Sequence, residues 1–253
     1  MPEQDTVVVV AGGASGIGAA TARRLGAAGC RVLVGDFDAD GARRTADEVT
    51  AAGGTALPHA FDLADEESVR ELIAAAVGEY GGLDGLFNVG ADMRALRGDT
   101  DVVDIDLAVW DRLLTVNLRG YLLTMRHAIP HLLQRGGGAI VNTSSAAAFQ
   151  GEPARPAYAA AKAGIGALTR HVATRWGRDG IRCNAVAPGF TATEAIRAAE
   201  RWPELEAGAL CRMHSPRVGE SADVAGLVTF LLSDDGAWIN GQVLNIDGGT
   251  VLR

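Results

Sequence analysis

Short runs of β-branched and other apolar residues alternate with longer segments rich in Ala, Leu and Arg along the chain. The short runs predict strands and the longer segments predict helices. The predicted strands are Val7–Val10, Val32–Gly35, Ala56–Phe61, Leu86–Val89, Ala139–Asn142, Cys183–Val186 and Val243–Ile246. The predicted helices are residues 16–28, 39–52, 65–80, 106–134, 155–178 and 221–233. The first strand is apolar throughout, which is typical of a strand buried on both faces of a parallel sheet. The alternation therefore predicts an α/β fold with a doubly wound parallel sheet of seven strands.

The length of 253 residues fits one domain over 1–253, and the chain contains no linker or internal repeat. Pro130 lies inside a helical pattern and predicts a kink there. Residues 189–216 form the least regular long segment. We expect this segment to act as a lid over a substrate.

Composition excludes several function classes. Hydrophobic residues make up 48% of the chain, which argues against disorder, and the net charge of −8 argues against a nucleic-acid partner. The apolar run after residue 6 is too short for a signal core or a membrane span. Three cysteines without CxxC spacing predict neither a disulfide framework nor a metal site. The expectation is a cytoplasmic protein that binds no metal and no membrane.

A glycine-rich loop follows the first predicted strand and opens the first predicted helix. It reads Ala11-Gly12-Gly13-Ala14-Ser15-Gly16-Ile17-Gly18. Glycines let the backbone turn tightly and approach a pyrophosphate, which then lies at the helix N-terminus. A plain tight turn would also use some of these glycines, so the spacing alone is weak evidence.

Asp36 ends the second predicted strand, 18 residues after Gly18. A carboxylate at this place accepts a hydrogen bond from a ribose 2′-hydroxyl and repels a 2′-phosphate. Neither Ser15 nor Phe37 supplies a compensating cation, so NAD is favoured over NADP. The alternative for Asp36 is a solvated loop acid.

Tyr158 and Lys162 are four residues apart in an alanine-rich helical segment, which places them on one helix face. A lysine cation beside a phenol favours the phenolate and lowers the pKa of the tyrosine, as general acid–base chemistry requires. The alternative is a surface tyrosine packed on a lysine stem. Lys162 is the only lysine of the chain, and every other cationic side chain is arginine.

Taken together, these motifs resemble a short-chain dehydrogenase/reductase of the single-domain type. The resemblance runs in order over nearly the whole chain and is carried by Gly12-x3-Gly16-x-Gly18, Asp36, Asn88, Asn117, Ser144-Ser145, Tyr158-x3-Lys162, Pro188-Gly189 and the ending Asn240-Gly241-Gln242-Val243-Leu244-Asn245-Ile246-Asp247-Gly248-Gly249. The chain departs from the family where Ala11 replaces a usual Thr, and where Asn88-Val89-Gly90-Ala91 replaces Asn-Asn-Ala-Gly. These departures predict altered local hydrogen bonding rather than lost activity.

The resemblance implies a catalytic role for four residues. Tyr158 is the expected general acid–base, Ser145 the residue that hydrogen-bonds the reacting oxygen, and Ser144 the less favoured serine. Lys162 is expected to hold the nicotinamide ribose, and Asn117 to anchor a proton-relay water. The cofactor-binding residues implied are Gly12, Ser15, Gly16, Ile17, Gly18, Asp36, Phe37, Asp62, Leu63, Asn88, Val89, Gly90, Tyr158, Lys162, Pro188, Gly189, Thr191 and Thr193.

The implied activity is NAD-dependent hydride transfer between nicotinamide and a small-molecule alcohol or carbonyl substrate. The resemblance also implies a homotetramer with dihedral symmetry, built partly from the helices predicted at 106–134 and 155–178. Two alternatives remain open: a nucleotide-binding sensor or scaffold that keeps the fold without turnover, and an enzyme of the same fold with dehydratase or epimerase chemistry. A scaffold has little need of Asn117, Ser145, Tyr158 and Lys162 together.

Overall fold

The computed structural model describes residues 2–252 and centres on one parallel sheet of seven strands in the order β3-β2-β1-β4-β5-β6-β9. The strands are β1 (Val7–Ala11), β2 (Arg31–Asp36), β3 (Thr55–Ala60), β4 (Gly85–Asn88), β5 (Gly138–Thr143), β6 (Ile181–Pro188) and β9 (Val243–Ile246). All seven predicted strands are present, with boundaries shifted by at most two residues. Every residue of β1 is buried, as its unbroken apolar sequence predicts.

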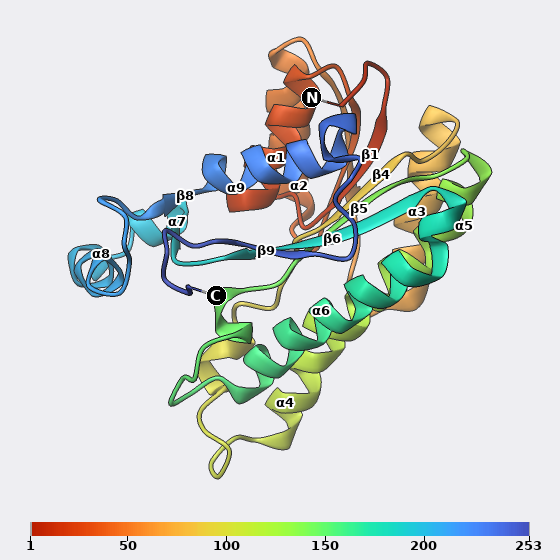
Figure 1. Cartoon of the computed structure of the whole chain (residues 1–253). Helices are drawn as coiled ribbons and strands as arrows, with labels where there is room; N and C mark the ends of the chain where they lie inside the picture. Colours follow the sequence, from red (N-terminus) through yellow and green to blue (C-terminus); the bar gives the residue numbers. More distant parts are fainter. Residues whose placement is uncertain (1, 253) are drawn as a thin grey trace.

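Helices cover both faces of the sheet, which confirms the doubly wound fold (Figure 1). One core lies between the sheet and the helices α1 (Gly16–Ala27), α2 (Ala39–Ala51) and α9 (Ser221–Leu232). The other core lies beneath the helices α3 (Glu66–Tyr80), α5 (Gly120–Gln134) and α6 (Pro156–Trp176). Alternate residues of β1 divide between them: Val8 and Val10 face the first core, and Val7 and Val9 face the second. Short 3₁₀ turns complete the connections at Ala95–Gly98, Ala146–Ala148, Gly177–Asp179 and Asp234–Gly236.

The single helix predicted over residues 106–134 is wrong, because the chain is interrupted there by one wide turn. The segment consists of α4 (Leu107–Leu114), a π-helical turn η2 (Thr115–Arg119) and α5. The interruption lies at η2 and not at Pro130, which α5 includes within one continuous helix. A π turn makes i→i+5 hydrogen bonds and needs no glycine or proline, so no helix-breaking residue marks it in the sequence.

The irregular segment 189–216 contains more secondary structure than its sequence indicates. It holds β7 (Thr191–Ala192), α7 (Glu194–Arg197) and α8 (Trp202–Leu210), and β7 pairs with β8 (Gly219–Glu220). Trp202 stacks on Phe190 with ring centroids 6.4 Å apart. The segment thus has its own small apolar cluster, separate from the two cores. Within residues 2–252, no helix is both long and apolar enough to cross a membrane.

Candidate active site

The expected site residues gather at the carboxyl edge of the sheet. In the strand order, β1 lies between β2 and β4, so the chain winds in opposite directions from this point. Such a switch point opens a crevice beyond the strand ends, and ligands of doubly wound folds bind there. The loops after β1, β4, β5 and β6 border this crevice.

The glycine-rich loop packs directly against the loop that follows β4. Gly12 has φ +113°, and a Cβ atom on it would lie 2.2 Å from the backbone nitrogen of Gly90. A Cβ on Gly18 would lie 1.9 Å from the carbonyl oxygen of Gly12. Ser15 is the N-cap of α1 but forms no side-chain capping bond, which leaves the N–H groups of the first turn directed at the loop. The glycines thus allow the loop to pack closely against its neighbours, and the uncapped first turn of α1 fits a pyrophosphate.

Around this loop lie most of the other residues expected to bind the cofactor. Asp36 accepts hydrogen bonds from the backbone N–H of Ala14 (2.9 Å) and from that of Asp38 (3.0 Å). Leu63 is buried, and a Cβ on Gly90 would lie 2.8 Å from its Cδ1 atom. Two further candidates lie on the side of the ribose and adenine. Phe37 is 72% exposed. Asp62 accepts a hydrogen bond from the N–H of Ala64.

The loop after β4, where the chain departs from the family pattern, is bonded to β1 through the backbone. The carbonyl oxygen of Ala11 accepts hydrogen bonds from the N–H groups of Val89 (2.9 Å) and Gly90 (2.8 Å). The backbone therefore joins β1 to this loop at Ala11, whose side chain has no hydroxyl. Asn88 is fully buried and donates to the side chain of Asn142 at 2.9 Å, which ties β4 to β5.

The start of the lid segment reaches the same loop from β6. A Cβ on Gly16 would lie 3.0 Å from the Cγ2 atom of Thr193. Thr191 donates to the carbonyl oxygen of Gly189 at 3.2 Å. Pro188 ends β6, so Pro188, Gly189, Thr191 and Thr193 connect the sheet edge to the glycine loop.

Ser145 and Tyr158 come together from two elements, and Ser144 takes a different role. Tyr158 lies in the first turn of α6, and Ser145 begins the 3₁₀ turn after β5. Burial raises the pKa of Tyr158, while a hydrogen bond with Ser145 and the nearby Arg155 cation act to lower it. Ser144 is buried and donates to the backbone oxygen of Lys162 at 2.8 Å, so its hydroxyl is directed away from the phenol.

Lys162 is 1% exposed, and its Nζ atom donates to the carbonyl oxygen of Thr143 at 2.8 Å. The same atom lies 3.5 Å from the hydroxyl of Tyr121 and 5.6 Å from the ring centroid of Tyr158. Burial without a carboxylate partner lowers the pKa of Lys162 to about 7. The Tyr158 pKa is raised overall, so the lowered value expected from Lys162 is wrong. The ammonium lies over the phenol ring, and burial opposes its own charge.

Asn117 lies in the π turn η2, and only one of the two polar atoms of its side chain has a hydrogen-bond partner among residues 2–252. Its Oδ1 atom accepts a hydrogen bond from the N–H of Asp92 at 2.8 Å. Its Nδ2 atom is buried and has no hydrogen-bond partner among residues 2–252. A buried amide with a spare donor, on a turn that disrupts the regular helix ladder, fits a place where another polar group binds.

One buried carboxylate bonded to the helix of Tyr158 was not predicted from the sequence. Asp99 is 3% exposed, and its carboxylate accepts hydrogen bonds from the backbone N–H groups of Ala157 and Tyr158. The two partners are 58 and 59 positions away, so no local pattern could indicate the contact. In the part of the chain the structure describes, no cluster of three or more His, Cys, Asp or Glu side chains could hold a metal ion.

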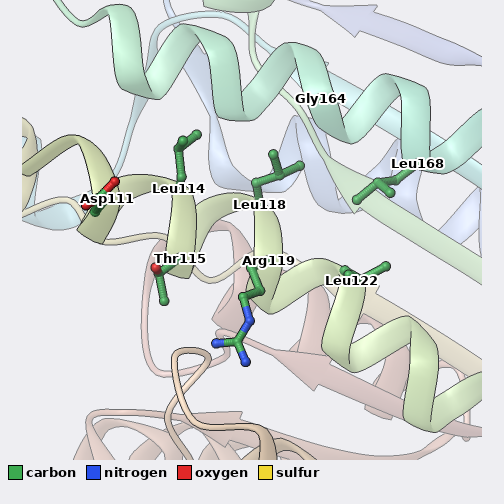
Figure 2. A pocket seen from close by; sticks show the side chains of 8 residues that line it. All are labelled: Asp111, Leu114, Thr115, Leu118, Arg119, Leu122, Gly164 and Leu168. Carbon is green, nitrogen blue, oxygen red and sulfur yellow. The ribbon is translucent and has the colours of Figure 1, made fainter. Parts of the chain in front are cut away.

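A separate apolar groove of about 650 Å³ lies on the outer side of α4, η2, α5 and α6. Figure 2 shows leucines from α4 and α5 directed toward the space beside Gly164 and Leu168 of α6. The groove residues are Asp111, Leu114, Thr115, Leu118, Arg119, Leu122, Gly164 and Leu168. It contains none of the expected catalytic or cofactor-binding residues.

Comparison with known proteins agrees with this geometry. Residues 12–251 match the family described as enoyl-(acyl carrier protein) reductase. A probable short-chain type dehydrogenase/reductase of Bradyrhizobium diazoefficiens is 44% identical over 96% of this chain and 86% of its own length. The cis-4-hydroxycyclohexanecarboxylate dehydrogenase of Sinomonas cyclohexanicum is 38% identical over 97% of this chain and 96% of its own. The structure of a 7α-hydroxysteroid dehydrogenase in complex with NADH and 7-oxo glycochenodeoxycholic acid superposes with a TM-score of 0.91, at 29% identity, over 100% of this chain and 96% of the other.

The chain belongs to the short-chain dehydrogenase/reductase family of oxidoreductases, whose members act on alcohols and ketones with a nicotinamide cofactor.

Proposed function

We propose that the protein is an NAD-dependent oxidoreductase that interconverts a secondary alcohol and a ketone, with Tyr158 as its general acid–base. The observation that carries this proposal is the convergence of Ser145, Tyr158 and Lys162 at the carboxyl edge of the sheet that also carries the glycine-rich loop. Bound NAD would supply the hydride acceptor for alcohol oxidation. Ser145 holds the reacting oxygen, and the Tyr158 phenolate accepts the hydroxyl proton.

The residues present fit the cofactor. Gly12, Gly16 and Gly18 let the loop pack tightly at the start of α1, where the pyrophosphate would bind, and Asp36 ends β2, where the adenosine ribose would bind. We assign Lys162 and the amide group of Asn117, which has no partner among the described residues, to the nicotinamide side. We include residues 189–216 in the proposal as the segment that closes over the substrate.

The substrate class that the relatives favour is an alicyclic secondary alcohol. One relative is named for a hydroxycyclohexanecarboxylate, and the superposed structure contains an oxidised bile acid. The test is a panel of cyclic and open-chain alcohols with NAD, followed by absorbance of the reduced nicotinamide. Turnover of the cyclic members with purified protein would support the proposal. Binding of NAD without turnover of any alcohol would instead favour the nucleotide-binding scaffold.

NAD is expected to bind more tightly than NADP, because the Asp36 carboxylate repels a 2′-phosphate and no cation at Ser15 or Phe37 offsets it. Asp36→Asn should narrow the ratio of the two dissociation constants by about 10-fold or more. Titration calorimetry with each cofactor measures the ratio. Asp40→Asn, at an exposed acid in α2, is the matched charge control and should leave the ratio unchanged. Equal affinity of the unmodified protein for both cofactors would contradict this assignment.

We further propose a homotetramer, with the groove on α4, α5 and α6 as one of its contacts. Leu122 lines the groove, and its side chain is 46% exposed. It therefore offers apolar area that a contact with another chain would bury. Leu122→Glu should produce a smaller species with unchanged helical circular dichroism, as measured by multi-angle light scattering. Leu57→Glu, at a 38% exposed leucine on the edge strand β3, should leave the mass unchanged. A monomer for the unmodified protein would refute the assembly.

A further inference from the structure

The helix that carries Tyr158 begins without a cap of its own. Arg155 is the N-cap of α6 and makes no side-chain capping bond, and its backbone has φ +71°. Pro156 follows and has no N–H group to donate. The N–H groups of Ala157 and Tyr158 therefore need acceptors from outside the local sequence.

Asp99 supplies both acceptors from the loop that follows β4. Its Oδ1 atom accepts from Ala157 at 3.1 Å, and its Oδ2 atom accepts from Tyr158 at 2.8 Å. The backbone makes a second connection, because the N–H of Arg155 donates to the carbonyl oxygens of Asp99 (3.1 Å) and Thr100 (2.9 Å). These bonds hold Arg155 in a conformation that non-glycine residues rarely adopt.

This connection differs from the other aspartate caps of the chain. Asp38, Asp65 and Asp106 cap α2, α3 and α4, and each accepts from a residue two or three positions later. Asp99 instead joins a loop at the switch point of the sheet to the helix bearing the phenol. It is also buried, so the two N–H donors are the partners that stabilise its charge.

We propose that Asp99 is a positioning residue that fixes the Tyr158 phenol against Ser145 by holding the backbone N–H of Tyr158 itself. The inference rests on the proposed function, in which that phenol transfers the proton. Ser145 is anchored at the end of β5, so any shift of the first turn of α6 changes the distance between the two hydroxyl groups. A misplacement of about 1 Å between reacting groups costs about 10²-fold in rate.

The experiment compares Asp99→Ala and Asp99→Asn with Asp106→Ala, using cyclohexanol and NAD as the probe. Asp99→Ala removes both acceptors, whereas asparagine keeps one carbonyl oxygen. Asp106→Ala removes a capping carboxylate from the same connection, seven residues further along, which accepts from the N–H of Ala108 in α4 and not from α6. For each variant, kcat, KM for NAD, the primary deuterium isotope effect on kcat, and amide exchange in the peptide covering 155–162 are measured.

Asp99→Ala is expected to lower kcat by about 10²-fold with KM for NAD unchanged, and Asp99→Asn should lie between it and the unmodified protein. The isotope effect should increase, because hydride transfer becomes slower than product release, and exchange should accelerate in the 155–162 peptide. Asp106→Ala should match the unmodified protein in all four measurements. Unchanged kcat in Asp99→Ala, or an equal loss in Asp106→Ala, would overturn the positioning role. Tyr158→Phe separates failure of the positioning role from failure of the proposed function. Full turnover in that variant would show that the phenol does not transfer the proton, whatever Asp99 does.

Discussion

Replacing Lys162 by arginine should leave a folded protein that has lost most of its turnover, by about 10²-fold or more. Lys162 is fully enclosed, and its Nζ atom lies 2.8 Å from the carbonyl oxygen of Thr143. A guanidinium group is larger and planar, and it keeps its proton at any pH at which the protein is folded. Burial lowers the pKa of Lys162 to about 7, so its ammonium loses a proton far more readily than an arginine would. Arginine cannot reproduce this property.

The measurement is kcat at neutral pH and across a pH series. Raising the pH should restore little of the lost turnover in Lys162→Arg, because the guanidinium keeps its proton throughout the series. Arg175→Lys is the matched control, because it makes the reverse change at an exposed place on the same helix and should leave kcat unchanged. Near-normal turnover of Lys162→Arg at neutral pH would mean that positive charge alone suffices.

Tyr158→Phe should lower turnover by about 10²- to 10⁴-fold, because it removes the group that exchanges the proton and leaves the packing in place. Burial raises the pKa of Tyr158, so the phenol is protonated in the free protein near neutral pH. Oxidation needs the phenolate as base, and the rate of oxidation should therefore increase as the pH rises toward that pKa. Reduction needs the phenol as acid, and its rate should fall over the same range.

Initial rates in both directions test this prediction, together with calorimetric titration of NAD. Cofactor affinity should change little, since Phe keeps the ring next to Lys162. Tyr80→Phe is the control, because Tyr80 lies in α3 and its hydroxyl bonds only the backbone oxygen of Val32 at 3.4 Å. Comparable kcat values for Tyr158→Phe and the unmodified protein would exclude Tyr158 as the acid–base.

The sheet could be predicted from sequence because its strands are short, apolar and separated by segments of helical period. A strand such as β1 is buried on both faces, so every residue in it carries the same signal. The glycine loop was equally visible, because the close contact of Gly12 with Gly90 excludes any side chain. Both features leave a signal in a short stretch of sequence, even where the contact that requires them is distant.

The helices α7 and α8 were not predicted, since both are short and α8 packs through the Phe190–Trp202 stack rather than along a long apolar stripe. The Asp99 contact and the direction of the Tyr158 pKa depend on groups brought together only by the fold. Sequence spacing placed Tyr158 and Lys162 on one face correctly. It could not show that the ammonium would lie against the ring and be fully buried.

The wide turn η2 also sets the angular phase between the two helices that it joins. Leu113 of α4 and Tyr121 of α5 are both fully buried, yet they are eight residues apart. In an unbroken α-helix, eight steps of about 100° would leave them about 80° apart around the axis. One extra residue in a π turn offsets that angle by about 100°, which brings the two side chains to within about 20° of each other. The turn that carries Asn117 therefore lets both helices bury a large side chain on nearly the same side of their common axis. A one-residue slip in the apolar period of a long helical pattern is the trace that such a turn leaves in a sequence.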